Sequence, residues 1–281
     1  MEKITEEKAT LQWHPAFFAG LQIELAEEAH HLIFESEHQL GTKPKEIDVL
    51  VIKKDSDVSI KKNIGRIFRK HNIIEYKSPD DYLSIDAFYK VYGYACFYKA
   101  DTTHANEIKA KEITISYVSK GYPYKLVKHL EREMHLKIQK IEKGIYYVLG
   151  MCFPIQLIVT SRLSMEENLW LASLTDDLKD LKQAEKLLKE YEEHKRENLY
   201  QSMMSIIIDA NEKVFKEEGN MCEAIYRIAR EKMQDEFLAR EMKGKEETLI
   251  SLVKDGLLSA VEAAKRLSIT EEELLQKVKM I

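Results

Sequence analysis

Two acidic residues and a lysine lie inside apolar stretches in the first third of the chain, at a spacing that would let them act together. Asp48 lies within the apolar run Ile47–Ile52, and Glu75 and Lys77 belong to a second apolar run. Side chains alternate along a strand, so Glu75 and Lys77 project from the same face, about 7 Å apart along the backbone. If the two runs form neighbouring strands, Asp48 can stand beside Glu75.

Carboxylates placed this way favour a metal site. Two carboxylates a few ångströms apart repel each other unless a positive charge lies between them. A divalent cation with oxygen ligands meets that need, and the carbonyl of Tyr76 is a candidate for a further ligand. Lys77 would then position a water molecule or stabilise negative charge developing on a phosphate.

A second interpretation needs no metal. Asp48, Glu75 and Lys77 are then solvent-facing charges at a sheet edge, and a Glu–Lys surface pair contributes about 0–1 kcal/mol. The nearly continuous Ile, Val and Leu around them favour central strands covered on both faces, where isolated charges are uncommon. The flanking residues therefore favour the metal site.

The elements that must position these residues follow from periodicity. Apolar spacings of three and four residues predict helices over Pro15–Ala29, Tyr82–Tyr98 and Pro123–Met134. Alternating or apolar runs predict strands over His31–His38, Ile47–Lys53, Asn72–Lys77, Glu112–Val118 and Gln156–Thr160, and a hairpin from Leu136–Ile141 and Ile145–Leu149. This order predicts a mixed α/β domain over residues 1–165.

The remainder, residues 166–281, has no proline and very little glycine, and is predicted to be helical. Two or three helices are expected between Thr175 and Lys243, followed by a small helix–turn–helix-like tail from Glu246. Apolar stripes need a partner, which predicts a homodimer through this region; they include Leu178, Leu181, Leu187 and Leu188. The tail suggests DNA reading, but the acidic run from Glu271 favours a packing or interaction role.

Composition narrows the classes of protein. The 281 residues include only 10 Gly and 5 Pro, which disfavours all-β sandwiches, collagen-like sequence and proline-rich disorder. The 43 basic residues against 48 acidic ones give a net charge of −5, so nucleic-acid contact must come from a local patch. The candidate patch is the basic run before the Glu75 strand, with a solvated face as the equal alternative; it holds Lys61, Lys62, Arg66, Arg69 and Lys70.

Other features exclude whole classes of site. Three cysteines lie far apart without a CxxC pair, so neither a disulfide framework nor a zinc motif is expected. The chain has no apolar run of about 18 residues and no signal-type N-terminus, so we expect no membrane partner and a cytoplasmic location.

The helix, the Asp-bearing strand, the Glu-x-Lys strand and the next helix together resemble the PD-(D/E)XK nuclease superfamily. More narrowly, Lys43–Ile52 followed by Ile73–Pro79 is similar to the recombination-promoting nuclease / putative transposase family. The helix Asp81–Tyr94 and the tail segment Asp255–Leu267 support the resemblance, which covers residues 15 to about 100 well and the rest loosely. Asp48 follows Ile47 here, and not the proline of the family name.

The resemblance implies a restriction-endonuclease-like mixed sheet flanked by helices and a Mg²⁺-dependent DNA endonuclease, with Mn²⁺ as a possible substitute. It assigns metal binding to Asp48 and Glu75 and makes Lys77 the catalytic lysine. The helical acid of the family would be Glu24, with Glu27 and Glu28 as rivals. No small-molecule cofactor is implied.

Two further points follow from the resemblance. Some relatives carry a Gln and, four residues later, a Tyr after the lysine; this chain has Lys90 and Tyr94, and Lys90 either touches the scissile phosphate or is a solvated helix lysine. The expected setting is recombination or a mobile element. The alternative function is a catalytically silent nuclease-fold protein that acts as an interaction or regulatory module, against which the intact Asp48, Glu75 and Lys77 count.

Overall fold

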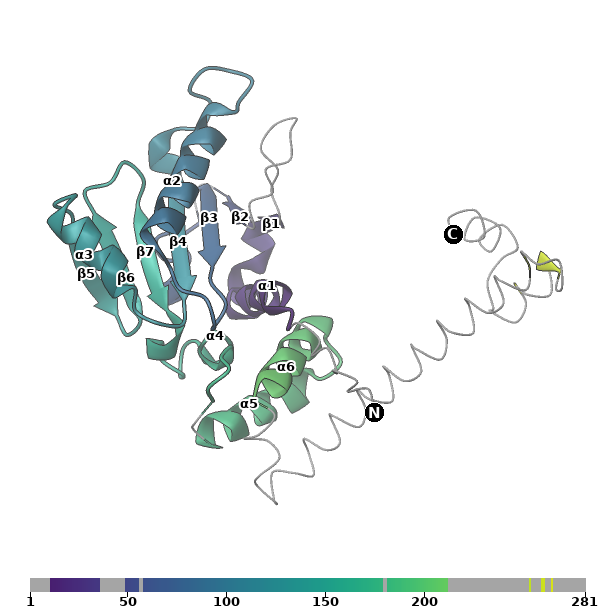
Figure 1. The fold of residues 1–281 in the computed structure, drawn as a ribbon. Helices are drawn as coiled ribbons and strands as arrows, with labels where there is room; N and C mark the ends of the chain where they lie inside the picture. Colours follow the sequence, from purple (N-terminus) through teal and green to yellow (C-terminus); the bar gives the residue numbers. More distant parts are fainter. Residues whose placement is uncertain are drawn as a thin grey trace, which may run out of the picture. The chain divides into compact units, whose positions relative to one another are not determined.

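The computed structural model describes residues 11–35, 49–55, 58–178 and 181–211, together with four single positions near the C-terminus (Figure 1). The chain divides into two compact units, residues 1–217 and 218–281. All elements below belong to the first unit. Asp48 and the predicted helix–turn–helix-like tail lie outside the described residues, except for the four single positions in the tail.

A seven-stranded mixed sheet forms the centre of the first unit. In sheet order, its strands are β1 (Leu32–Glu35), β2 (Val49–Lys54), β3 (His71–Tyr76), β4 (Ile113–Ser119), β7 (Ile155–Val159), β6 (Ile145–Leu149) and β5 (Lys137–Glu142). Strands β3, β4 and β7 are parallel, and every other neighbouring pair is antiparallel. The predicted α/β class is therefore confirmed as a mixed sheet flanked by helices.

Among the residues that the structure describes, six α-helices accompany the sheet: α1 (Trp13–Glu24), α2 (Ile85–Ala100), α3 (Tyr124–Arg132), α4 (Leu169–Ser173), α5 (Leu181–His194) and α6 (Asn198–Ala210). Four 3₁₀ turns complete the described part: η1 (Ala26–His31), η2 (Asn63–Gly65), η3 (Ala110–Glu112) and η4 (Thr160–Arg162). The Ser84 side chain caps α2 by accepting from the Ala87 amide at 3.0 Å, so this helix starts later than predicted.

Helices α2 and α3 cover one face of the sheet, and α1 lies on the other (Figure 1). On the α2 face, Ile73, Ile115 and Ile155 lie in register on β3, β4 and β7, and each is at most 1% exposed. Each such buried side chain contributes about 1.5–3 kcal/mol relative to an exposed one. This apolar layer packs against the inner side of α2 and α3 and makes β3 and β4 the rigid centre of the fold.

The connection between β2 and β3, described over residues 58–70, crosses the face of the sheet opposite α2. The Gln156 side chain on β7 donates to the Ile64 carbonyl at 2.8 Å and to the Ser116 hydroxyl at 2.8 Å. Ile60 and Phe68 of the connection are each 5% exposed. The β2–β3 connection, which contains the basic run, therefore packs on the sheet through both hydrogen bonds and apolar contacts.

Helices α4 and α6 pack on α1, so the predicted domain boundary at residue 165 lies inside the first unit. Gly20 of α1 makes this close approach possible, since a Cβ there would meet the Met203 Cε at 3.0 Å and the Leu171 Cδ2 at 3.2 Å. Leu178, Leu187 and Leu188 are buried within the chain. These three leucines of the stripe that predicted a homodimer are thus covered by the same chain, and the side chain of Leu181 lies outside the described part.

Strands β5 and β6 form the predicted hairpin, and β5 lies at one edge of the sheet. Gly144 at its turn has φ +77°, and a Cβ there would lie 2.8 Å from the Val159 oxygen, so no larger residue fits. On the outer strand β5, Lys137 and Lys140 are exposed.

In the part of the chain that is described, no helix is both long and apolar enough to cross a bilayer.

Candidate functional site

Glu75 lies near the C-terminal end of the central strand β3 and is 6% exposed. It alternates with Ile73, so its side chain belongs to the face covered by α2. Its neighbour across the sheet is Tyr117 on β4, whose hydroxyl donates to the Phe88 carbonyl at 2.8 Å. A carboxylate in such apolar surroundings requires a compensating positive charge.

Lys77 supplies that charge. Its Nζ lies 2.9 Å from the Glu75 Oε1 and 3.6 Å from the Asp81 Oδ2. Burial lowers the pKa of Lys77, but the hydrogen bond and charge of Glu75, joined by Asp81, outweigh burial and leave that pKa above its ordinary value. Lys77 therefore stays protonated at neutral pH. The structure brings Glu75 and Lys77 together, as their spacing predicted, and adds Asp81 as a second carboxylate beside Lys77.

Asp48 lies outside the described residues, so the metal pair of Asp48 and Glu75 stays a prediction. The strand that follows Asp48 is in the expected place, since β2 is antiparallel to β3 and Val49 pairs with Glu75. Among the residues that the structure describes, no group of three His, Cys, Asp or Glu side chains is arranged to hold a metal.

Tyr76 points to the opposite face of the sheet from Glu75. Its ring stacks on Phe17 of α1 with centroids 4.2 Å apart, and its hydroxyl is buried without a hydrogen-bond partner in the described chain. Burial, helped by the charge of Asp176, raises the pKa of Tyr76, which stays neutral. Its backbone carbonyl as a metal ligand stays a prediction.

Glu24 is held by protein donors. Its Oε1 accepts from the Trp170 amide at 3.0 Å and the Leu171 amide at 3.2 Å, and its Oε2 lies 2.5 Å from the Lys62 Nζ. Burial raises the pKa of Glu24, and Lys62 opposes this rise. One carboxylate oxygen of Glu24 thus binds the start of α4, and the other binds the β2–β3 connection. Of the two rivals, Glu27 is exposed, and Glu28 accepts from the Lys61 amide at 2.9 Å.

The predicted phosphate-binding residues are divided between ion pairs and solvent. Lys62 pairs with Glu24, Arg66 with Glu142, and Lys70 with Glu112 at 2.8 Å. Three of the predicted side chains are exposed and form no ion pair with the described chain, namely Lys61, Arg69 and Lys90. Lys90 lies on α2, away from the β2–β3 connection.

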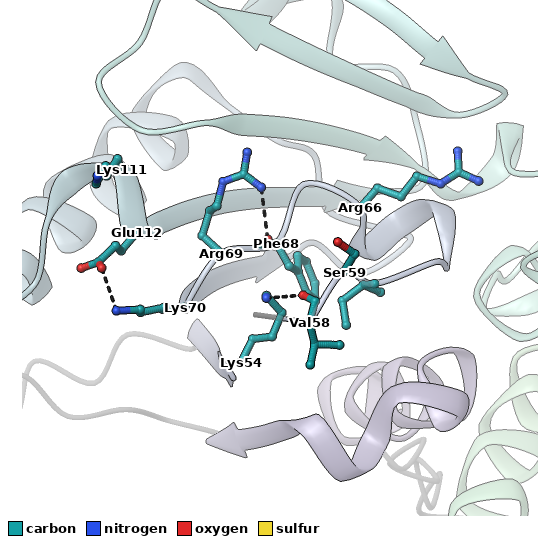
Figure 2. A pocket seen from close by; sticks show the side chains of 10 residues that line it. Lys54, Val58, Ser59, Arg66, Phe68, Arg69, Lys70, Lys111 and Glu112 are labelled. Atoms are coloured by element: carbon teal, nitrogen blue, oxygen red, sulfur yellow. Dashed lines mark hydrogen bonds and ion pairs between the residues drawn. The ribbon is translucent and has the colours of Figure 1, made fainter. Parts of the chain in front are cut away.

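The connection forms a basic pocket of about 280 Å³ (Figure 2). The pocket is lined by Lys54, Val58, Ser59, Ile60, Arg66, Phe68, Arg69, Lys70, Lys111 and Glu112. Lys70 immediately precedes β3, whereas Glu75 lies five residues further on, a separation of roughly 17 Å along the strand. Three residues of the basic run, Arg66, Arg69 and Lys70, therefore line a pocket at the other end of β3 from Glu75, whereas Lys61 and Lys62 line a second pocket with Glu27 and Glu28. This separation could not be read from the sequence.

The surface next to Lys77 carries two exposed tyrosines, Tyr82 and Tyr124. Tyr82 is 64% exposed with the Lys125 Nζ 6.0 Å from its ring centroid, and Tyr124 is 69% exposed with its hydroxyl accepting from Arg162 at 3.1 Å. Tyr82 directly follows Asp81, so this aromatic and basic surface borders the Glu75–Lys77 pair. No sequence signal distinguished these tyrosines from buried ones.

Comparison of the chain with family models, with curated proteins and with solved structures finds no match.

Proposed function

We propose that this chain is a metal-dependent DNA endonuclease that hydrolyses phosphodiester bonds, in the setting of recombination or a mobile element. The observation that carries the proposal is the 2.9 Å contact between buried Glu75 and Lys77 at the end of the central strand. The order of elements supports it, because α1, the strand after Asp48, the Glu-x-Lys strand and α2 follow one another as the PD-(D/E)XK resemblance implies.

In this proposal, Asp48 and Glu75 hold Mg²⁺ or Mn²⁺. Their carboxylate oxygens suit such hard cations, and a buried carboxylate like Glu75 gains from a second positive charge. When bound, the ion supplies Lewis acidity and an activated water. Lys77, kept protonated by Glu75 and Asp81, stabilises the charge that develops on the phosphate, and it does not act as the base.

The surface beside the pair suits a nucleic-acid strand. Aromatic side chains offer stacking faces to bases, and neighbouring cations contact phosphates. Tyr82 and Tyr124 are exposed, and Lys125 and Arg162 lie against aromatic rings of this surface. We therefore assign the DNA contact nearest the cut to this surface rather than to the basic run.

A second candidate function is the silent nuclease-fold module. The favouring observation is that Lys77, shared by Glu75 and Asp81, already compensates the buried carboxylate without a metal. The ion pair is then stable without a metal ion, and the protein would act by binding partners at its surface.

Cleavage of supercoiled plasmid with Mg²⁺ or Mn²⁺ separates the two functions. Glu75→Gln and Lys77→Met are each expected to reduce nicking by at least about 100-fold, because the first removes a charged metal ligand and the second removes a positive charge at the reacting phosphate. Lys140→Ala is the control, since this exposed lysine lies on the edge strand β5, four strands away from β3, and it should cut like the wild type. Wild-type protein that binds neither ion and cuts no DNA would support the silent module.

A further inference from the structure

The basic pocket of the β2–β3 connection has an excess of positive charge. Among the described residues, five cationic side chains and one carboxylate line it. Arg66 and Lys70 are compensated by Glu142 and Glu112. Neither Arg69 nor Lys111 forms an ion pair with a carboxylate of the described chain. A concave site with uncompensated cations raises the local concentration of anions.

The pocket is also held in a fixed shape. The Arg69 amide donates to the Asn72 Oδ1 at 2.7 Å, and the Asn72 Nδ2 donates to the Arg69 carbonyl at 2.8 Å. Asn72 is fully buried on β3 and accepts a further bond from Thr114 at 2.6 Å. The backbone of Arg69 is therefore positioned before any ligand arrives, which lowers the entropic cost of binding.

A buried lysine completes the lining. Lys54 is 8% exposed, and its Nζ donates to the Asp55 carbonyl at 2.9 Å and the Val58 carbonyl at 2.5 Å. In the view of Figure 2, Arg69 and Lys111 extend above the pocket, and Lys54 and Lys70 lie below them. Cations thus border the pocket on more than one side.

We infer that this pocket binds a phosphate monoester, separately from the Glu75–Lys77 pair. A monoester carries close to two negative charges at neutral pH, against one for an internal phosphodiester. Arginine binds such oxygens through two parallel hydrogen bonds. The volume of about 280 Å³ lies at the lower limit of small-molecule sites and suits a group no larger than a mononucleotide. The monoester belongs to a free mononucleotide or to the phosphorylated end of a nucleic-acid strand.

Calorimetric titration of the whole chain in EDTA tests the site without any cleavage. The probes are inorganic phosphate, deoxyadenosine monophosphate, and one short oligonucleotide with and without a 5′-phosphate. Binding of the nucleotide and of the phosphorylated oligonucleotide, but not of the unphosphorylated one, is expected. A preference for the nucleotide over the phosphorylated oligonucleotide identifies the free nucleotide as the source, and the reverse identifies a strand end.

Paired variants locate the site. Arg69→Ala with Lys111→Ala should weaken phosphate binding by at least about tenfold, because two charged donors are lost. Lys128→Ala with Arg132→Ala changes the net charge equally on α3 and should leave binding unchanged. All four side chains are exposed, so both double variants should keep the wild-type melting temperature.

Two results would overturn the inference. One is the absence of binding for every phosphate probe at about 1 mM in low salt; the other is an equal loss in the two double variants. Neither result bears on plasmid cleavage, and inactive protein that still binds the nucleotide would refute the nuclease proposal alone.

Discussion

At the scale of single residues, Glu24 joins three parts of the chain. It is the last residue of α1, accepts hydrogen bonds from the Trp170 and Leu171 amides in α4, and pairs with Lys62 of the β2–β3 connection. These contacts account for its burial without any catalytic role. A buried carboxylate that accepts two amides and pairs with a lysine is expensive to remove, because the donors are left unsatisfied.

Glu24→Ala should therefore lower the free energy of unfolding by about 3 kcal/mol, as measured by urea denaturation. Glu27→Ala, three residues later and exposed, should change it by less than about 0.5 kcal/mol. A Glu24→Ala protein as stable as the wild type but unable to cut DNA would instead restore the catalytic role that the family resemblance implies.

Glu112 makes the stability of the fold depend on pH in the acidic range. The hydrogen bond from Lys70, helped by the Lys109 amide, lowers the pKa of Glu112 from its ordinary 4.5 to about 2. Below pH 4.5 the unfolded chain takes up this proton before the folded chain does, so the stabilisation is present above that pH and is lost as pH falls toward 2. Thermal melting of wild type and Glu112→Gln should differ most at neutral pH and converge near pH 2. Melting temperatures that stay equally far apart at every pH would contradict the assignment.

At the scale of elements, the β2–β3 connection depends on Asn72. Its side chain makes four hydrogen bonds, to the Ile52 carbonyl, to both backbone groups of Arg69 and to Thr114. Asn72→Ala leaves several buried groups unsatisfied and should cost about 2–4 kcal/mol of stability, measured by chemical denaturation.

The same Asn72→Ala variant, folded at low temperature, should also bind phosphate more weakly, since Arg69 loses its support. Gln139→Ala on the exposed edge strand is the matched polar control and should alter neither property. Unchanged stability in Asn72→Ala would show that the connection is held by its apolar residues alone.

The elements around the Glu75–Lys77 pair were predictable because their signals are local. Alternation fixed β3 and β4 to within one residue, and it placed Lys77 on the side of Glu75. Contacts between distant parts of the chain carry no such local signal. The donors to Glu24 lie 146 and 147 residues away. Arg66, Arg69 and Lys70 line a pocket at the opposite end of β3 from Glu75, which only the path of the connection across the sheet determines.

At the scale of the whole molecule, α1 lies between the sheet and the later helices. Its residues face Tyr76 on one side and Met203 and Leu171 on the other. Helices α4 to α6 therefore complete the core instead of forming a separate domain. A chain cut before them would expose the buried side of α1 to water.

Two truncated proteins test this. Residues 1–217 should unfold in one cooperative transition with intact near-ultraviolet circular dichroism, whereas residues 1–165 should aggregate or bind a hydrophobic dye. Size-exclusion chromatography distinguishes the outcomes. A soluble, cooperatively unfolding fragment 1–165 would restore the boundary that the sequence suggested.

The lysines of β5 bear on the tendency of this protein to aggregate at high concentration. An open sheet ends in strands whose backbone groups are free to pair with another chain, and such edges seed fibrils. Lys137 and Lys140 place positive charges along that edge, and the ladder shifts register between Lys140 and Glu142. Charged lysines on an edge strand are one of the features that discourage such pairing between copies, so replacing Lys137 and Lys140 by apolar residues should increase aggregation at high protein concentration.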